Sequence, residues 1–165
     1  MPRGSNYVVT NYSKDPAIGY NFLLRVEGIY DVPCRKISPI RKDNEYEIIK
    51  EGGVNDYVHL KRKQIQQPFT FEVERYVGMD YLDPLPNGAE MILPIILFVG
   101  SGYGNILTNT RRTYIFTGCV VMGKEYGELN AEHSGLLIEK TKIAYETMYT
   151  LDGIMGDMSL LSSIF

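Results

Sequence analysis

Apolar and polar residues alternate in several short segments of this chain. Residues 21–27 place Phe22, Leu24 and Val26 on one side of an extended backbone, and residues 69–75 repeat the pattern with Phe69 and Phe71. A period of two is typical of a strand with one buried face. Both segments are therefore predicted to be half-buried β-strands.

Further strands are expected between segments rich in Gly, Pro, Asp and Asn. Pro94 lies inside one of them and predicts an edge strand or a bulge, because proline cannot donate to a ladder. The apolar parity changes near Glu139-Lys140, which also indicates a bulge or a change of neighbour. Turns are expected at Asp31-Val32-Pro33 and at Glu51-Gly52-Gly53. The additional strand candidates are residues 34–37, 46–50, 57–61, 91–99, 112–122 and 135–148.

Many short strands predict a mainly β fold, an antiparallel β-barrel or two packed sheets, with at most one or two short helices. The length of 165 residues suits one domain. We expect an N-terminal arm (1–19), the β domain (20–148) and a C-terminal tail (149–165).

The tail carries a helical pattern. Ile154, Met158, Leu161 and Phe165 are spaced four, three and four, and Asp152 could cap the start. So short a helix is marginal in water and needs a surface to pack on. A disordered terminus is the alternative.

Two segments are apolar on both faces, residues 91–99 and 113–122. A chain of this size has little capacity to cover both faces of two such strands. We expect burial against neighbouring copies to do so.

Composition and charge argue against several classes of function. The net charge of -3 gives no basic footprint for nucleic acid. Cys34 and Cys119 are far apart and form no CxxC, so we expect reduced thiols. No apolar signal segment is visible near the N-terminus, and no apolar run approaches the ~20 residues of a membrane helix. We therefore expect synthesis in the cytoplasm and no membrane insertion.

Candidate chemistry is sparse. His59 and His133 have no metal-ligand spacing, and Ser134 lacks a GxSxG context. The glycine-rich Gly100–Gly104 segment is followed by turn and β patterns, whereas a phosphate-binding loop opens a helix. We expect no catalytic residue, no cofactor and no metal, and hence no enzyme.

The order of motifs resembles the inner tail-tube proteins of contractile phages and contractile injection systems, with the type VI secretion tube protein as a more distant relative. The resemblance covers roughly residues 20–148, and its most specific single motif is the Glu-Gly-Gly-x-Asn turn. Residues 78–88 depart from the family, which usually has a Trp-containing helix there, and the C-terminal tail is an addition. The matching segments are Tyr20–Gly28, Glu51-Gly52-Gly53-Val54-Asn55, Phe69–Arg75, Tyr114–Gly118, Gly123-Lys124, Leu129-Asn130-Ala131 and Leu136–Glu146.

The resemblance implies a β-barrel of two antiparallel sheets that assembles as six-fold rings stacked into a hollow tube. Its implied partners are copies of itself, sheath and baseplate proteins, and DNA or protein cargo that passes through the lumen without sequence-specific binding. Assembly into a phage tail or injection particle follows. A baseplate tube initiator of the same fold, a monomeric β-barrel binding module and an enzyme with an unread site remain alternatives.

Eight residues are candidate assembly contacts. Two consecutive glycines permit positive φ or close backbone approach, so we expect the first motif to belong to an interface, with a simple hairpin turn as the alternative. The tail is expected to dock on the subunit's own barrel or on a neighbour. The candidates are Glu51, Gly52, Gly53 and Asn55 in the turn, and Ile154, Met158, Leu161 and Phe165 in the tail.

Overall fold

The architecture is taken from a computed structural model, which describes residues 19–49, 59–78, 83–102, 105–132 and 135–152. These residues form strands, turns and loops, and they contain no helix. No helix in this part of the chain could therefore span a membrane. The expected mainly β fold is confirmed.

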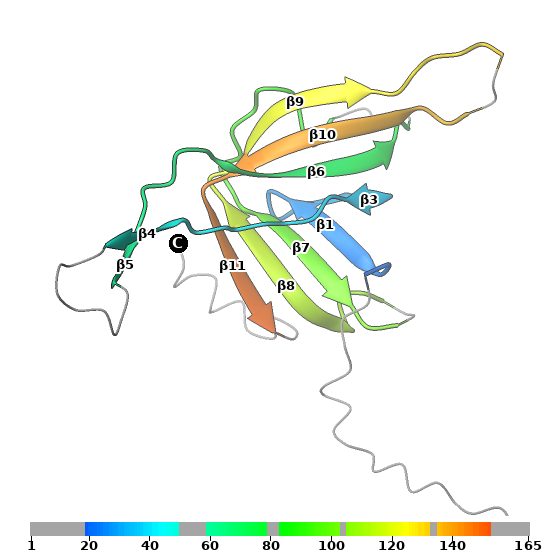
Figure 1. The fold of residues 1–165 in the computed structure, drawn as a ribbon. Helices are drawn as coiled ribbons and strands as arrows, with labels where there is room; N and C mark the ends of the chain where they lie inside the picture. The colour runs from blue at the N-terminus through cyan, green and yellow to red at the C-terminus, as the bar shows by residue number, and fades with distance from the viewer. Residues whose placement is uncertain (1–18, 50–58, 79–82, 103–104, 133–134, 153–165) are drawn as a thin grey trace, which may run out of the picture.

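Two antiparallel sheets pack face to face (Figure 1). The five-stranded sheet has the order β11-β8-β7-β1-β2, and the four-stranded sheet has the order β3-β6-β10-β9. The five-stranded sheet contains β1 (Phe22–Val26), β2 (Tyr30–Val32), β7 (Ile95–Gly100), β8 (Thr110–Thr117) and β11 (Thr147–Asp152). The four-stranded sheet contains β3 (Lys36–Ile37), β6 (Phe69–Tyr76), β9 (Val120–Tyr126) and β10 (Ile138–Tyr145). Together they form two packed sheets rather than a closed barrel.

The alternating segments became strands, as predicted. Leu24 and Val26 of β1, and Phe71 and Val73 of β6, are buried in one core between the sheets. An aromatic cluster crosses this core, because Phe71 of β6 lies 4.6 Å from Phe116 of β8, measured between ring centroids.

Three details of the strand prediction were wrong. The first turn falls at Glu27 and Gly28, which have φ values of 50° and 71°, so Asp31 and Val32 belong to β2. Pro94 precedes β7, which is a central strand, so its missing N–H costs no ladder bond. The irregularity expected near Glu139-Lys140 is present in β10, but its position was wrong, because the register shifts between Lys142 and Ile143.

Two expected strands are each divided between the sheets. Residues 112–122 bend at Gly118 and Cys119, so β8 lies in one sheet and β9 in the other. Residues 135–148 likewise divide at Glu146 into β10 and β11. Because β11 pairs with β8 as far as Asp152, residues 149–152 belong to the sheet and not to a tail.

The outer face of β7 and β8 is covered at Ile96 and Ile115 within a single chain, which was not expected. Ile115 has no exposed surface and Ile96 is 7% exposed within a single chain. Both point away from the core cluster that contains Ile95 and Phe116. The expectation that neighbouring copies cover both faces is therefore wrong for Ile96 and Ile115. In the same two segments Ile92, Leu93 and Met122 are exposed, and their burial against neighbouring copies stays a prediction.

Gly118 is required at the corner between the sheets. Its φ is 61°, and a Cβ built there would lie 2.6 Å from side-chain atoms of Glu146. We expect Gly118→Ala to lower the free energy of unfolding by about 1–2 kcal/mol, because an L-residue is disfavoured in the left-handed region. Urea denaturation measures this change. Gly123→Ala in β9 is the matched control, since nothing lies within 4 Å of its added Cβ, and an equal loss in both variants would contradict the argument.

Candidate assembly surfaces

The eight sequence-predicted contact residues lie outside the described residues. Glu51, Gly52, Gly53 and Asn55 fall in 50–58, and the four tail residues fall in 153–165. Asp152, the expected helix cap, is instead the last residue of β11. The turn and tail contacts therefore stay predictions.

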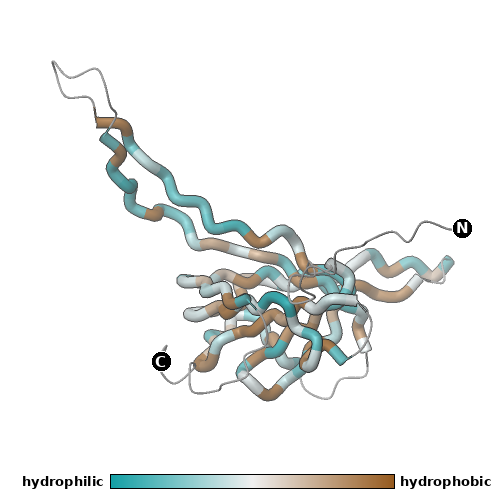
Figure 2. The backbone as a smooth tube through the Cα atoms, turned by 90° about the horizontal axis from the view of Figure 1, so that it is seen from below, coloured by the Kyte–Doolittle hydropathy of each residue, from teal (hydrophilic) through white to brown (hydrophobic). Residues whose placement is uncertain are grey.

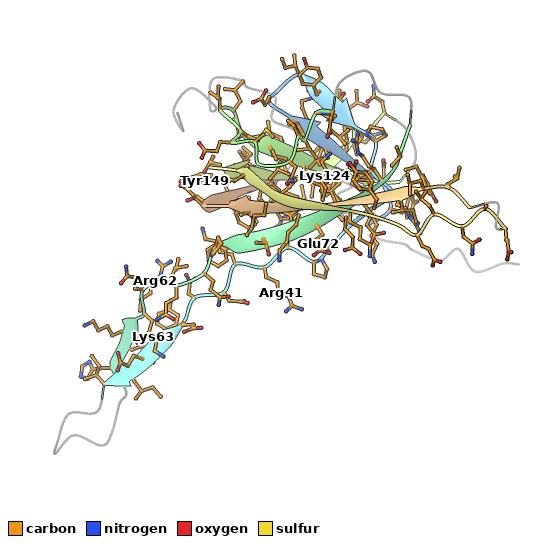
Figure 3. The ribbon with its side chains drawn as sticks, turned by 90° about the horizontal axis from the view of Figure 1, so that it is seen from above. Arg41, Arg62, Lys63, Glu72, Lys124 and Tyr149 are labelled. Carbon is orange, nitrogen blue, oxygen red and sulfur yellow. The ribbon has the colours of Figure 1, made fainter. Side chains whose placement is uncertain are left out.

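The chain on both sides of the predicted turn forms an arm. β4 (Tyr46–Ile49) and β5 (His59–Arg62) pair with each other and join neither packed sheet. We call residues 45–49 and 59–63 the arm. It projects away from the sandwich in all three views (Figures 1, 2 and 3). Every residue of the two strands is exposed.

The arm has one apolar face. Register places Tyr46 opposite Arg62 and Ile48 opposite Leu60, and directly opposed residues share a face of the ladder. Tyr46, Ile48 and Leu60 are 53%, 57% and 64% exposed. Glu47, Ile49, His59 and Lys61 form the other, mainly polar face. A two-stranded hairpin is marginally stable alone, so this apolar face predicts a partner surface.

Polar contacts fix the base of the arm. The Lys63 amide donates to the Glu45 carbonyl at 2.8 Å, and Nη2 of Arg62 donates to Oδ1 of Asn44 at 2.6 Å. The hydroxyl of Tyr145 donates to the Arg41 carbonyl at 2.7 Å, which ties the incoming chain to the core. The Tyr46/Ile48 alternation was visible in the sequence, but only the pairing with Leu60 shows a continuous face.

A second surface is an apolar slot in the sandwich. β3 has only two residues, so the four-stranded sheet ends early and leaves part of the inner face of the five-stranded sheet half-buried. The space between them has a volume of about 510 Å³. We call it the inter-sheet slot, and its lining is Gly19, Phe22, Arg35, Lys36, Ile37, Ser38, Ile40, Leu97, Val99, Tyr114 and Met148.

The free edge of β9 is a third surface. The amides of Gly88 and Met91 donate to the Val121 and Cys119 carbonyls, so the segment before β7 covers the first half of this edge. Exposed apolar side chains follow along the rest of β9 and the connection to β10. They are Met122, Tyr126, Leu129 and Leu136.

A buried charge cluster holds residues 83–85, in the segment before β7, to the four-stranded sheet. Oε1 of Glu139 accepts from Nε of Arg75 at 2.8 Å and from Nζ of Lys124 at 3.1 Å. Asp83 pairs with both cations, and its Oδ1 also accepts the Leu85 amide at 3.0 Å. Figure 3 labels Lys124 on β9 of the four-stranded sheet. The cluster thus joins β6, β9 and β10 to the segment at 83–85.

The two cations of the cluster lower the pKa values of its two carboxylates. Burial by itself would raise the pKa of Glu139, but hydrogen bonds and charge from Arg75 and Lys124 outweigh it and hold the pKa below its usual value. The pKa of Asp83 is lowered in the same way, against the effect of burial. Sequence reasoning missed this cluster. The available signal was the pair Glu139 and Thr141 at inward positions of β10.

The described residues show no group of three or more His, Cys, Asp or Glu side chains that could hold a metal. Both cysteines are free. Burial raises the pKa of Cys34 to about 12 and that of Cys119 to about 11. Neither thiol is therefore activated as a nucleophile, which requires a lowered pKa.

No protein-family model and no curated protein matches the sequence. The fold, however, matches chains in solved contractile injection systems. A chain of the six-fold symmetrised anti-feeding prophage baseplate has a TM-score of 0.62 at 17% identity, covering 84% of this chain and 97% of that chain. A chain of the PVC sheath-tube complex in the extended state gives 0.69 at 13%, covering 87% and 99%. A chain of the anti-feeding prophage tube-terminating cap gives 0.68 at 12%, covering 93% and 100%. The protein thus has the fold of these chains.

Proposed function

We propose that the protein is a non-enzymatic structural subunit of the inner tube of a contractile phage tail or injection system. It forms hexameric rings that stack around a lumen for DNA or protein cargo, next to sheath and baseplate proteins. The shared fold and the near-complete coverage of the PVC sheath-tube chain support this proposal.

The observation that carries the proposal is the arm. Tyr46, Ile48 and Leu60 present an apolar face that no part of the described sandwich covers. We infer that its partner is a surface of another molecule. A contact between two different surfaces of identical subunits is heterologous, and it generates closed rings or open-ended stacks.

A tube initiator at the baseplate, or another adaptor at a tube end, is the second candidate. Its support is the similarity to chains of the anti-feeding prophage baseplate and cap, which is comparable with the similarity to the sheath-tube chain. Both candidates use the same fold, so assembly behaviour separates them.

Purified protein is expected to form rings or tubes as its concentration rises, because assembly buries the exposed apolar surfaces of the arm and of β9. Negative-stain electron microscopy and light scattering measure this. Long tubes favour the main subunit, whereas single rings, or growth only on added baseplate proteins, favour the initiator. Strictly monomeric particles under every one of these conditions contradict both candidates and favour a monomeric binding module.

A further inference from the structure

We propose that residues 153–165, which follow β11 and are called the C-terminal segment below, cover the inter-sheet slot of their own sandwich. The proposal goes beyond the proposed function, because it concerns a single copy and does not depend on assembly. It names the surface on which the predicted C-terminal helix packs, and it closes the sandwich where β3 is short.

The inter-sheet slot is an uncovered part of the inner face of the five-stranded sheet. Phe22, Val99, Tyr114 and Met148 line it from that sheet, and all four are half-buried. The ends of β7 and β11 point away from the four-stranded sheet (Figure 1). Half-buried apolar side chains gain further burial when another apolar group covers them. The volume of about 510 Å³ has room for more than one aliphatic or aromatic side chain.

The strand register places the end of β11 in line with this slot. One row of directly opposed residues crosses β11, β8, β7 and β1, namely Asp152, Arg112, Val99 and Phe22. Directly opposed residues share a face of the sheet, and Val99 and Phe22 line the slot. The chain therefore leaves β11 in the same row as the slot.

The length of the C-terminal segment fits this path. Neighbouring strands lie about 4.8 Å apart, so the row from β11 to β1 spans roughly 14 Å. A helix formed by the thirteen residues 153–165 would be about 20 Å long. The segment can therefore cross all four strands without leaving the subunit that carries it.

The segment has an apolar face to place on the slot. Ile154, Met158, Leu161 and Phe165 recur at helical spacing and fall on one side of a helix. A helix this short is marginal in water and needs a surface to pack on. The slot provides an apolar surface in the row where the segment begins.

The charged side chains around the slot have a positive balance. Arg35 and Lys36 are its charged lining residues. Lys36 pairs with Glu74 at 3.7 Å, and Arg112 pairs with Asp152 at 3.1 Å. These two pairs balance, so the charge of Arg35 gives the rim a net positive charge that favours an acidic occupant.

This charge distinguishes the two ends of the chain. The C-terminal segment contains one acidic residue, Asp157, and no Lys or Arg. Residues 1–18 are the other candidate occupant, because they join the slot at Gly19, but they contain two basic residues and one acidic residue. The C-terminal segment is therefore the better match.

The first test is photo-crosslinking of the full-length chain with p-benzoylphenylalanine in place of Tyr114. We expect crosslinks to peptides from residues 153–165, identified by mass spectrometry. The same group in place of Tyr149, which points to the face of β11 opposite Met148, is the matched control and should give few of them. Crosslinks that reach residues 1–18 instead, or no peptide of the C-terminal segment, overturn the proposal.

A mixture of unlabelled and ¹⁵N-labelled chains shows which copy supplies the segment. Crosslinked pairs that carry a single isotope are expected, because the segment and the slot belong to one chain. Pairs of mixed isotope at the frequency of random exchange would show that the segment comes from another copy and would overturn the proposal. The proposed function is tested separately by electron microscopy, so the two can fail independently.

The second test measures amide hydrogen exchange in residues 153–165. Leu161→Lys is expected to speed this exchange by about tenfold, because it removes the burial of one large apolar side chain. Ser163→Lys, on the opposite side of the helix, is the matched control and should change it little. Met148→Lys in the slot should speed the exchange as Leu161→Lys does, while circular dichroism shows a folded chain. Equal effects of Leu161→Lys and Ser163→Lys, or wild-type exchange at the rate of an unfolded peptide, overturn the proposal.

Discussion

Replacing Glu139 by glutamine is expected to lower the free energy of unfolding by about 3 kcal/mol, because it leaves buried cations without sufficient counter-charge. The side chains of Glu139, Arg75 and Lys124 are 3%, 8% and 6% exposed. Without the Glu139 charge, the partly exposed Asp83 is the carboxylate that still pairs with both cations among the contacts described above. Urea denaturation at neutral pH measures the loss.

The acid dependence of stability gives the same prediction a second measurement. The pKa of Glu139 in the folded chain lies below its ordinary value. The charge cluster therefore contributes stability above the ordinary carboxyl range, and this contribution is lost as the pH falls from that range through the lowered pKa of Glu139. Glu139→Gln should remove this part of the loss, so its stability profile should be flatter between neutral and acidic pH. Parallel profiles for the two proteins would contradict this account.

Two controls isolate the buried charge. Glu125→Gln, on an exposed position of β9, should change stability by less than about 0.5 kcal/mol. The double variant Arg75→Met with Glu139→Leu removes one cation and one anion together and leaves Lys124 paired with Asp83. It should recover part of the loss, because replacing a buried ion pair by apolar groups is often neutral. A double variant less stable than either single variant would show that the pair acts in another way.

The sequence predicted those strands whose one face is buried and whose other face is polar. In β6, Phe71 and Val73 are buried while Glu72 is exposed, so alternation and burial agree. Sequence reasoning failed where polar side chains are turned inward. Glu139 and Thr141 occupy buried positions of β10 because Arg75 and Lys124 neutralise the cluster, and no local pattern shows partners from two other strands.

Strand boundaries failed for a related reason. Residues 112–122 were predicted to form one continuous strand, yet the chain changes sheets at Gly118, where a positive φ and the close Glu146 side chain define a corner. A single glycine in such a run does not separate a corner from a bulge. Ile96 and Ile115 lie on the outer face of the five-stranded sheet, where we expected a neighbouring copy to cover them. Both are buried within one chain.

The sequence indicated only part of the candidate assembly surfaces. The resemblance pointed to the turn at 51–55, and the structure describes the strands on both sides of it. That Tyr46, Ile48 and Leu60 share a face depends on the register of β4 with β5, which a nine-residue connection does not specify. The inter-sheet slot depends on the short length of β3, and that length depends on how the two sheets pack.

Phe116→Ala is expected to lower the free energy of unfolding by about 3–5 kcal/mol, the range for deleting a fully buried aromatic ring. Phe116 has no exposed surface, and its ring centroid lies 4.6 Å from that of Phe71 and 5.0 Å from that of Tyr145. These rings belong to opposite sheets, so the cavity would weaken the contact that holds the sandwich together. Urea denaturation measures the loss.

The same variant connects core packing to assembly. Tyr145 holds the Arg41 carbonyl at the base of the arm, so a cavity beside its ring should also loosen the arm and raise the concentration needed for assembly. Tyr149→Ala, at a half-exposed position of β11 (Figure 3), is the control and should cost less than about 1 kcal/mol. Phe116→Leu, which keeps most of the volume, should fall between them. Equal stability losses for Phe116→Ala and Tyr149→Ala would show that the aromatic cluster does not join the two sheets.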